Sequence, residues 1–209
     1  MEKFLFSIIA ITLFIVTACN NSSDKTSNET DTLKMNNDTM EKTTTPADTS
    51  MTTVTPTFTN IDTKLSSDIK AVVDHYLHIK NALVNNSGSE AASGGKAMKE
   101  AIVKIDKSLF TAEQKNVYDD IADDLKEHAE HIGANEGNID HQREHFTMMS
   151  EDVYDLVKAF GGGQILYHDH CPMANDNKGA MWLSKMKEVK NPYFGGKMNE
   201  CVKVLEVIK

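Results

Sequence analysis

The sequence predicts an all-α fold, an antiparallel four-helix bundle with an irregular, short-helical C-terminal tail packed on it. Four stretches of the chain carry apolar residues that alternate three and four positions apart, which is the period of an amphipathic helix. Short polar segments join these stretches, as in bundles of antiparallel helices. No alternation of apolar and polar residues continues for any length, so we expect strands to be minor at most.

The chain begins with a pattern typical of an exported lipoprotein. Lys3 precedes an apolar run at 4–16, and small residues then lead directly to Cys19. The run is shorter than the about 20 apolar residues that a spanning helix needs, which disfavours an uncleaved anchor. We expect residues 1–18 to be a signal peptide and Cys19 to carry lipid. The protein would then be anchored to a membrane of the cell envelope and face the periplasm or the exterior.

Residues 19–57 are expected to form a disordered tether. They consist largely of Asn, Ser, Thr and Asp, and cannot bury enough apolar surface to offset the entropy of ordering. The remaining residues, 58–209, have the size of one domain. We divide this domain into a helical bundle and a C-terminal tail at 164–209, which contains Cys171 and Cys201.

The first two helices are predicted at 62–84 and 97–105. Glycine disfavours helix, so Gly94 and Gly95 weaken the start of the second, which we place after them. The apolar stripe of the first helix consists of Leu65, Ile69, Val72, Tyr76, Ile79 and Leu83.

The third and fourth helices are predicted at 110–132 and 139–160. Thr111 and Gln114 form a capping-box pattern at the start of the third. Glycines at 161–163 provide a stop for the fourth. The two stripes consist of Val117, Ile121, Leu125, His128 and Ile132, and of Ile139, Phe146, Met149, Val153, Leu156 and Phe160.

Composition and motifs disfavour two functional classes. The formal net charge of -9 at pH 7 argues against binding of nucleic acid, since neutralising phosphates requires clustered Lys and Arg. No residues resemble a nucleophile with a base and an orienting group, and no oxyanion-stabilising motif accompanies Cys171. We therefore expect a binding or structural protein, not an enzyme.

Histidines recur in pairs on the predicted helices. A spacing of three or four positions puts both members of a pair on one helix face, where two imidazoles can share a metal ion. The alternative is that they are exposed polar residues, or that His128 is a satisfied histidine at the edge of the core. The pairs are His75 and His78, His128 and His131, and His141 and His145.

The tail contains two short groups of soft metal ligands, "YHDHCPM" at 167–173 and "GGKMNEC" at 195–201. Thiolates and thioethers select soft ions, above all Cu(I), whereas imidazole suits copper and zinc. If the turn at 191–195 folds the tail back, the two groups can face each other around copper. Tetrahedral zinc on two cysteines and two histidines is also possible, but it leaves the methionines unexplained. The candidate ligands are Cys171, Met173, Met198, Cys201, His168 and His170.

A disulfide is the alternative reading of the two tail cysteines. If Cys19 is lipidated, Cys171 and Cys201 remain as an even pair, which in an oxidising compartment is typical of a disulfide. Closing the loop between them would stabilise the fold by about 3 kcal/mol. Methionines are also common core residues. On this reading the protein is a structural or adaptor-docking module without a metal, and the sequence leaves both readings open.

Three motifs of the tail resemble a known family. They are Tyr-x-x-x-Cys-Pro-Met-Ala at 167–174, Asn-Lys-Gly-Ala-x-Trp-Leu-Ser at 177–184 and Asn-Pro-Tyr-Phe-Gly-x-x-Met-x-x-Cys at 191–201. Together with "QREHFTMMSEDVY" at 142–154 they resemble a Bacteroidetes-type exported domain family of unknown function. That family occurs as stand-alone lipoproteins, and also fused to the C-terminus of periplasmic adaptors of copper/silver efflux pumps. The resemblance extends over the folded part and is densest from Gln142 onward.

The resemblance implies a role in heavy-metal handling. Combined with the soft ligands of the tail, it leads us to expect a lipid-anchored, extracytoplasmic heavy-metal binding protein, with Cu(I) the favoured ion and zinc the second. The expected role is sequestration of the metal or its delivery to an efflux system. The expected partners are the metal ion, an adaptor of a heavy-metal efflux pump and, through the lipid, the membrane.

Overall fold

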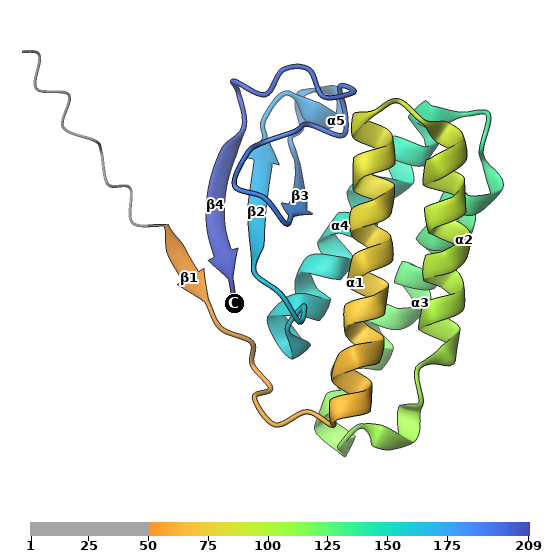
Figure 1. Ribbon diagram of the computed structural model, residues 1–209, viewed down its shortest axis with the longest axis vertical. Helices are drawn as coiled ribbons and strands as arrows, with labels where there is room; N and C mark the ends of the chain where they lie inside the picture. Colours follow the sequence, from red (N-terminus) through yellow and green to blue (C-terminus); the bar gives the residue numbers. More distant parts are fainter. Residues whose placement is uncertain (1–50) are drawn as a thin grey trace, which may run out of the picture. The chain divides into compact units, whose positions relative to one another are not determined.

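Four long helices and a four-stranded sheet make up residues 51–209, the part of the chain that the computed structural model describes (Figure 1). The predicted signal peptide at 1–18, Cys19 and the tether up to residue 50 lie outside the described residues. Within residues 51–209, no helix has the length and apolar character needed to cross a membrane.

The four predicted helices are present and follow one another along the chain. They are α1 (Thr63–Val84), α2 (Gly88–Lys104), α3 (Ala112–Ala134) and α4 (Ile139–Phe160). Thr111 and Gln114 make the predicted capping box at the start of α3. Gly161, with a φ of 80°, ends α4 in a conformation that glycine tolerates best. A short 3-10 helix, η1 (Lys107–Leu109), lies between α2 and α3.

Helix α2 begins nearer the N-terminus than the sequence predicted, because its glycines serve packing. A Cβ atom on Gly94 would lie 2.7 Å from Cγ1 of Ile79 in α1. One on Gly95 would lie 2.7 Å from the carbonyl oxygen of Ala129 in α3. These two glycines therefore allow α2 to approach both neighbouring helices closely, and that contact offsets their low helix propensity.

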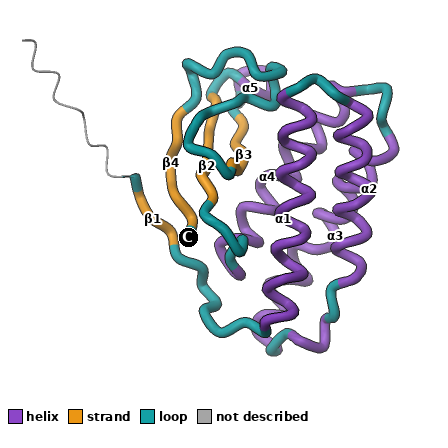
Figure 2. The backbone as a smooth tube through the Cα atoms, viewed as in Figure 1, coloured by secondary structure: helices purple, strands orange, loops and turns teal. Residues whose placement is uncertain are grey.

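The prediction that the tail is irregular or short-helical, within an all-α fold, was wrong. The tail contributes β2 (Leu166–Cys171), β3 (Ala180–Ser184) and β4 (Lys203–Ile208) to a sheet in the order β1-β4-β2-β3 (Figure 2). Strand β2 pairs antiparallel with both β3 and β4. One turn labelled α5 (Ala174–Asn177) lies between β2 and β3, and three of its residues have a positive φ.

Two features hid the strands from the sequence pattern. Strand β2 carries buried residues on both faces, so it does not alternate apolar with polar positions. In the pairing of β2 with β4, His168 is opposite Glu206 and Asp169 is opposite Val204. Leu205 is therefore left over as a bulge that interrupts the alternation in β4.

Regular structure is present within the predicted tether, which was expected to extend to residue 57. Strand β1 (Thr52–Val54) pairs in parallel with β4. The backbone N–H groups of Thr57 and Phe58 donate to carbonyl oxygens at the end of α4, both at 2.9 Å. Phe58 packs on the Phe160 ring, with 5.2 Å between centroids. Residues 52–58 are thus held by pairing and aromatic contact, which a composition-based prediction of disorder cannot detect.

The edge strand β3 docks on the helices through one buried tyrosine. The Tyr76 hydroxyl in α1 accepts a hydrogen bond from the backbone N–H of Leu183 at 2.9 Å. The same hydroxyl lies 2.9 Å from the Ser150 Oγ of α4. Because these atoms are buried, the bonds replace contacts with water that folding removes. One hydrophobic core accordingly joins the four helices to β2, β3 and β4.

Candidate metal centre

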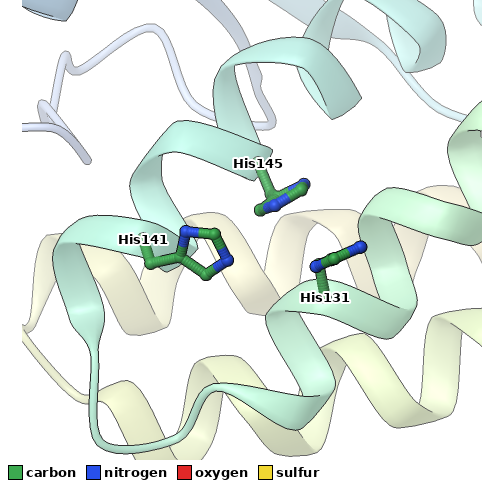
Figure 3. Close-up of side chains that lie close together, drawn as sticks. All are labelled: His131, His141 and His145. Carbon is green, nitrogen blue, oxygen red and sulfur yellow. The ribbon is translucent and has the colours of Figure 1, made fainter.

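Three histidines of α3 and α4 lie close enough together to bind one ion. His131 comes from the last turns of α3, and His141 and His145 come from the first turns of α4 (Figure 3). One ring nitrogen from each lies within 4.8 Å of the others. Among residues 51–209, this is the one set of three or more His, Cys, Asp or Glu side chains that meets this criterion.

Helix spacing and the short connection between α3 and α4 create this arrangement. His141 and His145 are four residues apart, so both project from the same face of α4. The connection from Asn135 to Asn138 reverses the chain, and the side chain of Asn138 caps α4 by accepting from the His141 N–H at 3.2 Å. The end of α3 with His131 therefore lies beside the start of α4.

The rings already contact one another. The His131 and His145 rings stack, with centroids 4.2 Å apart and an interplanar angle of 9°. The His141 ring meets the His145 ring edge-on at 4.6 Å. Nitrogen ligands of a tetrahedral ion at about 2.0–2.1 Å are roughly 3.3 Å apart. The rings would have to rotate to converge, and the partly exposed His131 and His141 side chains have room to do so.

A fourth histidine extends the centre towards the core. Nδ1 of His128 lies 3.2 Å from Nδ1 of His145. On its other side, Nε2 of His128 lies 3.8 Å from Oδ2 of Asp152, which is an ion-pair distance and too long for a hydrogen bond. That carboxylate oxygen is buried and has no hydrogen-bond partner within residues 51–209. His128 is thus placed between a ligand candidate and a buried carboxylate.

Burial controls the charge state of the inner residues. Burial, followed by the charges of the neighbouring histidines, lowers the pKa of His145 to about 4. Burial also lowers the pKa of His128. Both rings are consequently neutral at pH 7 and retain the lone pair that a metal ligand needs. Burial, assisted by Asp124 and other acidic neighbours, raises the pKa of Asp152 to about 7.

Carboxylates surround the more exposed histidines. Oε2 of Glu144 lies 3.0 Å from Nδ1 of His141, and Oε1 of Glu127 lies 3.8 Å from Nε2 of His131. Such outer carboxylates orient imidazole ligands. They also add negative charge around a position where a cation would bind.

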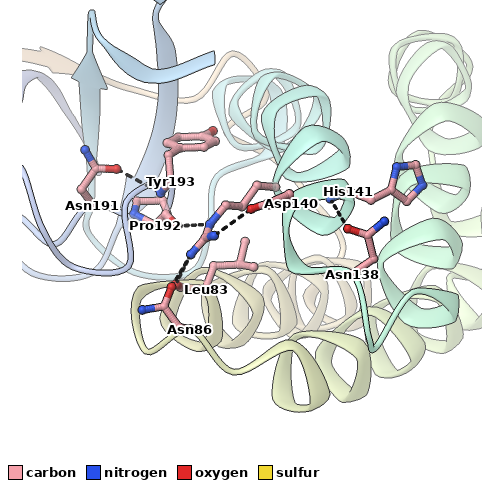
Figure 4. A network of polar contacts seen from close by, with 9 residues as sticks. Leu83, Asn86, Asn138, Asp140, His141, Asn191, Pro192 and Tyr193 are labelled. Atoms are coloured by element: carbon pink, nitrogen blue, oxygen red, sulfur yellow. Dashed lines mark hydrogen bonds and ion pairs between the residues drawn. The ribbon is translucent and has the colours of Figure 1, made fainter. Parts of the chain in front are cut away.

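A polar network fixes the first turns of α4 (Figure 4). The Arg143 guanidinium donates to the Pro192 carbonyl at 3.0 Å and to Oδ1 of Asn86 at 2.6 Å. It also pairs with Asp140 at 3.3 Å. Because Arg143 lies between His141 and His145 in sequence, these bonds tie the histidine-bearing segment to the end of α1 and to the tail.

The tail cysteines lie side by side as free thiols. Sγ of Cys171 is 3.3 Å from Sγ of Cys201. The contact with Cys171 is the main cause of a raised Cys201 pKa, so that thiol forms its thiolate less readily than an isolated cysteine. Two thiolates on a tetrahedral ion at about 2.3 Å would be roughly 3.8 Å apart. The pair would have to open slightly for metal binding.

The two tail methionines line one open pocket of about 440 Å³. Met173 follows β2 and is exposed, whereas Met198 lies on the segment before β4 with a left-handed φ of 53°. Glu144 and Tyr193 line the same pocket. The structure therefore brings the four sulfur residues into one region, although the cysteines themselves do not line the pocket.

His168 and His170 do not join the sulfur residues. Successive side chains of a strand point to opposite faces, and the register of β2 with β3 is unbroken from Tyr167 to Cys171. Both histidines therefore extend from the face opposite to Cys171. Nδ1 of His168 lies 3.4 Å from Oε2 of Glu206, and burial lowers the pKa of His168. The two predicted histidine ligands and Cys171 therefore extend from opposite faces of β2.

Residues 72–164 match the family model described as a protein of unknown function (DUF3347). The match contains most of α1 and all of α2, α3 and α4, and hence the four clustered histidines and Asp152. It ends before β2, so the sulfur residues of the tail lie outside it. Comparison with curated proteins and with solved structures found no match.

Sequence reasoning named the four clustered histidines but not Asp152. A signal for Asp152 was present, because it follows His145 by seven residues, which is two helical turns, and so shares its face of α4. That face could be recognised from the helical period alone. The placement of His128 between His145 and Asp152 could not, because it depends on how α3 packs against α4.

Proposed function

We propose that this protein binds copper outside the cytoplasm, with His131, His141 and His145 as the ligands, and that it sequesters the ion or delivers it to a heavy-metal efflux system. The observation that carries the proposal is the convergence of three imidazoles from two helices within 4.8 Å. Imidazole suits copper and zinc, and a site of this kind generally binds Cu(II) more tightly than Zn(II). Zinc is therefore the second candidate ion.

The cellular part of the proposal rests on sequence. The signal pattern and Cys19 support a lipid-anchored protein on the outer side of a membrane. The resemblance to domains fused to efflux adaptors supports such an adaptor as the partner. The proposed activity is binding, not catalysis, and it involves no nucleic acid.

A competition titration tests the metal centre. The mature protein would be titrated with Cu(II) and Zn(II) against a chromophoric chelator, together with His131→Gln and His141→Gln. We expect each substitution to weaken binding by at least about 100-fold, more than the 10–100-fold typical of losing an outer partner. His78→Gln is the matched control, because His78 lies on α1 and pairs with Glu90. Equal affinities in all four proteins would refute the assignment.

The tail sulfurs offer a separate copper set, for Cu(I). Cys171, Cys201, Met173 and Met198 remain candidate ligands for this softer ion, which thiolates and thioethers favour. A Cu(I) titration of Cys171→Ser and Cys201→Ser tests them against the native protein. If all three bind Cu(I) equally, the sulfurs are not ligands.

The second candidate function is a structural or adaptor-docking module stapled by a disulfide. The observation that favours it is the 3.3 Å separation of the Cys171 and Cys201 sulfurs, from which a bond can form with little rearrangement. Counting reactive thiols before and after reduction distinguishes this module from a protein that binds Cu(I) through free thiols. No free thiol in protein isolated under oxidising conditions favours the staple, whereas two free thiols exclude it.

A further inference from the structure

Three partly buried side chains form a line that ends at the histidine centre. Asp152 on α4 faces His128 on α3, which faces His145 on α4. The Nε2 to Oδ2 distance is 3.8 Å and the Nδ1 to Nδ1 distance is 3.2 Å. The Asp152 side chain is 22 % exposed, and its Oδ2 atom is buried. Nothing in the proposed ligand set explains why a carboxylate should be placed there.

One arrangement of the protons along this line leaves a nitrogen of His145 free for a metal ion. A neutral histidine carries a single N–H, on either Nδ1 or Nε2. If the Asp152 carboxylate accepts from His128 Nε2–H, Nδ1 of His128 is left as an acceptor. Nδ1 of His145 must then carry the proton that completes the 3.2 Å contact. Nε2 of His145 is left unprotonated, which makes it the nitrogen available to a metal ion.

We propose that Asp152 and His128 are positioning residues of the metal centre, which set the tautomer of His145 and direct its Nε2 towards the ion. The inference rests on the proposed function, in which His145 is a ligand. Carboxylates commonly orient metal-bound imidazoles by accepting a hydrogen bond from them. Asp152 would do this indirectly, because it would orient His128, which in turn orients His145.

The geometry permits this role with a small movement. The separation of 3.8 Å must shorten by roughly 0.8 Å to reach hydrogen-bond length. Oδ2 of Asp152 is free to make the bond, because it has no other hydrogen-bond partner within the described residues. The other charged groups around Asp152 are acidic, namely Asp124 of α3 and Asp155 and Glu151 of α4. None of them donates a hydrogen bond that would compete with His128.

The direct test reads the histidine tautomers in the metal-free protein. Long-range proton–nitrogen correlation spectra distinguish a protonated from an unprotonated imidazole nitrogen. We expect His145 to carry its proton on Nδ1 in the native protein and to move towards the Nε2–H form in Asp152→Ala. Asp155→Ala, which removes an exposed carboxylate from the same helix, should leave His145 unchanged. An Nε2–H tautomer of His145 in the native protein would overturn the proposal.

The second test measures affinity. Asp152→Ala should weaken Zn(II) and Cu(II) binding by about 10–100-fold, the range for losing an outer partner. Asp155→Ala should change it by less than about threefold, and Asp152→Glu should restore both the affinity and the tautomer. Equal affinities in Asp152→Ala and Asp155→Ala would refute the positioning role.

The two tests separate this inference from the proposed function. If the native protein binds neither Zn(II) nor Cu(II), the proposed function fails, and the tautomers still decide whether the Asp152–His128–His145 line exists. If the metal binds at the histidines but the tautomer of His145 is independent of Asp152, only the positioning role fails. Circular dichroism of each variant would show that loss of affinity does not come from loss of the fold.

Discussion

The histidine centre and the sulfur region of the tail are assembled in different ways. The four histidines project from two helices that are adjacent along the chain, so a local period and one short connection bring them together. The cysteines are separated by a strand and a long loop, and they meet because β2 and the segment before β4 are positioned by the sheet. The first arrangement needs two helices, whereas the second needs the complete fold of the tail.

This difference has a functional consequence. His131 and His141 are partly exposed, so their rings can rotate around an ion without disturbing the core. Cys171 is fully buried within the core that joins the sheet to the helices, so any change at its sulfur affects packing. We therefore expect metal to act mainly at the histidines and oxidation mainly at the cysteines.

The largest expected effect comes from removing the tail's central side chain. Trp182 in β3 is fully buried and packs on Tyr193, which in turn packs on Phe146 of α4. Trp182→Ala should lower the free energy of unfolding by about 3–5 kcal/mol. Urea unfolding followed by far-ultraviolet circular dichroism would measure it, with the exposed Met186→Ala as control. If the helices of Trp182→Ala unfold at the same urea concentration as those of the native protein, the tail does not stabilise the bundle.

Oxidation of the cysteine pair should have the next largest effect. A Cys171–Cys201 disulfide would raise the free energy of unfolding by about 3–4 kcal/mol through loop closure. It should leave the affinity of the histidine centre for Zn(II) unchanged, because no cysteine belongs to that centre. Unfolding and titration with and without reductant would test both points. In Cys201→Ser the reductant should not change the midpoint of unfolding. A change there would show that the effect of the reductant does not come from a Cys171–Cys201 disulfide.

Removing the Tyr76 hydroxyl should weaken the join between the two regions. Tyr76→Phe leaves the buried Leu183 N–H without its acceptor, which costs about 1–3 kcal/mol. Loss of protection of the Leu183 amide against hydrogen exchange would locate the effect at the sheet edge. The partly exposed Tyr167→Phe on β2 provides the control. An unchanged exchange rate at Leu183 would show that this hydrogen bond does not hold β3 on the helices.

The smallest expected effect is on the pH dependence of stability, where two residues of the centre oppose each other. The pKa of His145 falls from 6.5 to about 4, so between these pH values the unfolded state binds more protons and acid destabilises the fold. The pKa of Asp152 rises from 3.8 to about 7, so in that window the folded state binds more protons and acid stabilises it. The contributions of these two residues to the pH dependence should therefore largely offset each other between pH 6.5 and pH 4.

Two variants separate these contributions. Relative to the native protein, His145→Gln should gain stability as the pH falls from 7 to 5, because it lacks the histidine whose lowered pKa makes acid destabilise the fold. Asp152→Ala should lose stability over the same interval. The free energy of unfolding in urea at the two pH values provides the measurement. A shift of both variants in the same direction would contradict the pKa assignments.

Much of the helical part could be predicted from the sequence. The apolar stripes of α1, α3 and α4 follow the helical period, and the Thr111–Gln114 cap marks the start of α3. The start of α2 could not be placed from the sequence. The low helix propensity of two glycines is a local property, whereas the close contacts with α1 and α3 that offset it involve residues distant in the chain. The strands were missed because β2 is buried on both faces and a bulge interrupts β4.

The candidate site shows the same division. The helical period identifies which histidines share a helix face, and chain order shows which sulfur residues are near neighbours, since both depend on spacings of a few residues. Packing of the helices brings the pairs on α3 and α4 together and leaves His75 and His78 outside the centre. Pairing of the strands turns His168 and His170 away from Cys171. The physical reason is that periodicity is a property of the local backbone, whereas convergence of ligands depends on which faces are buried against each other when distant segments pack.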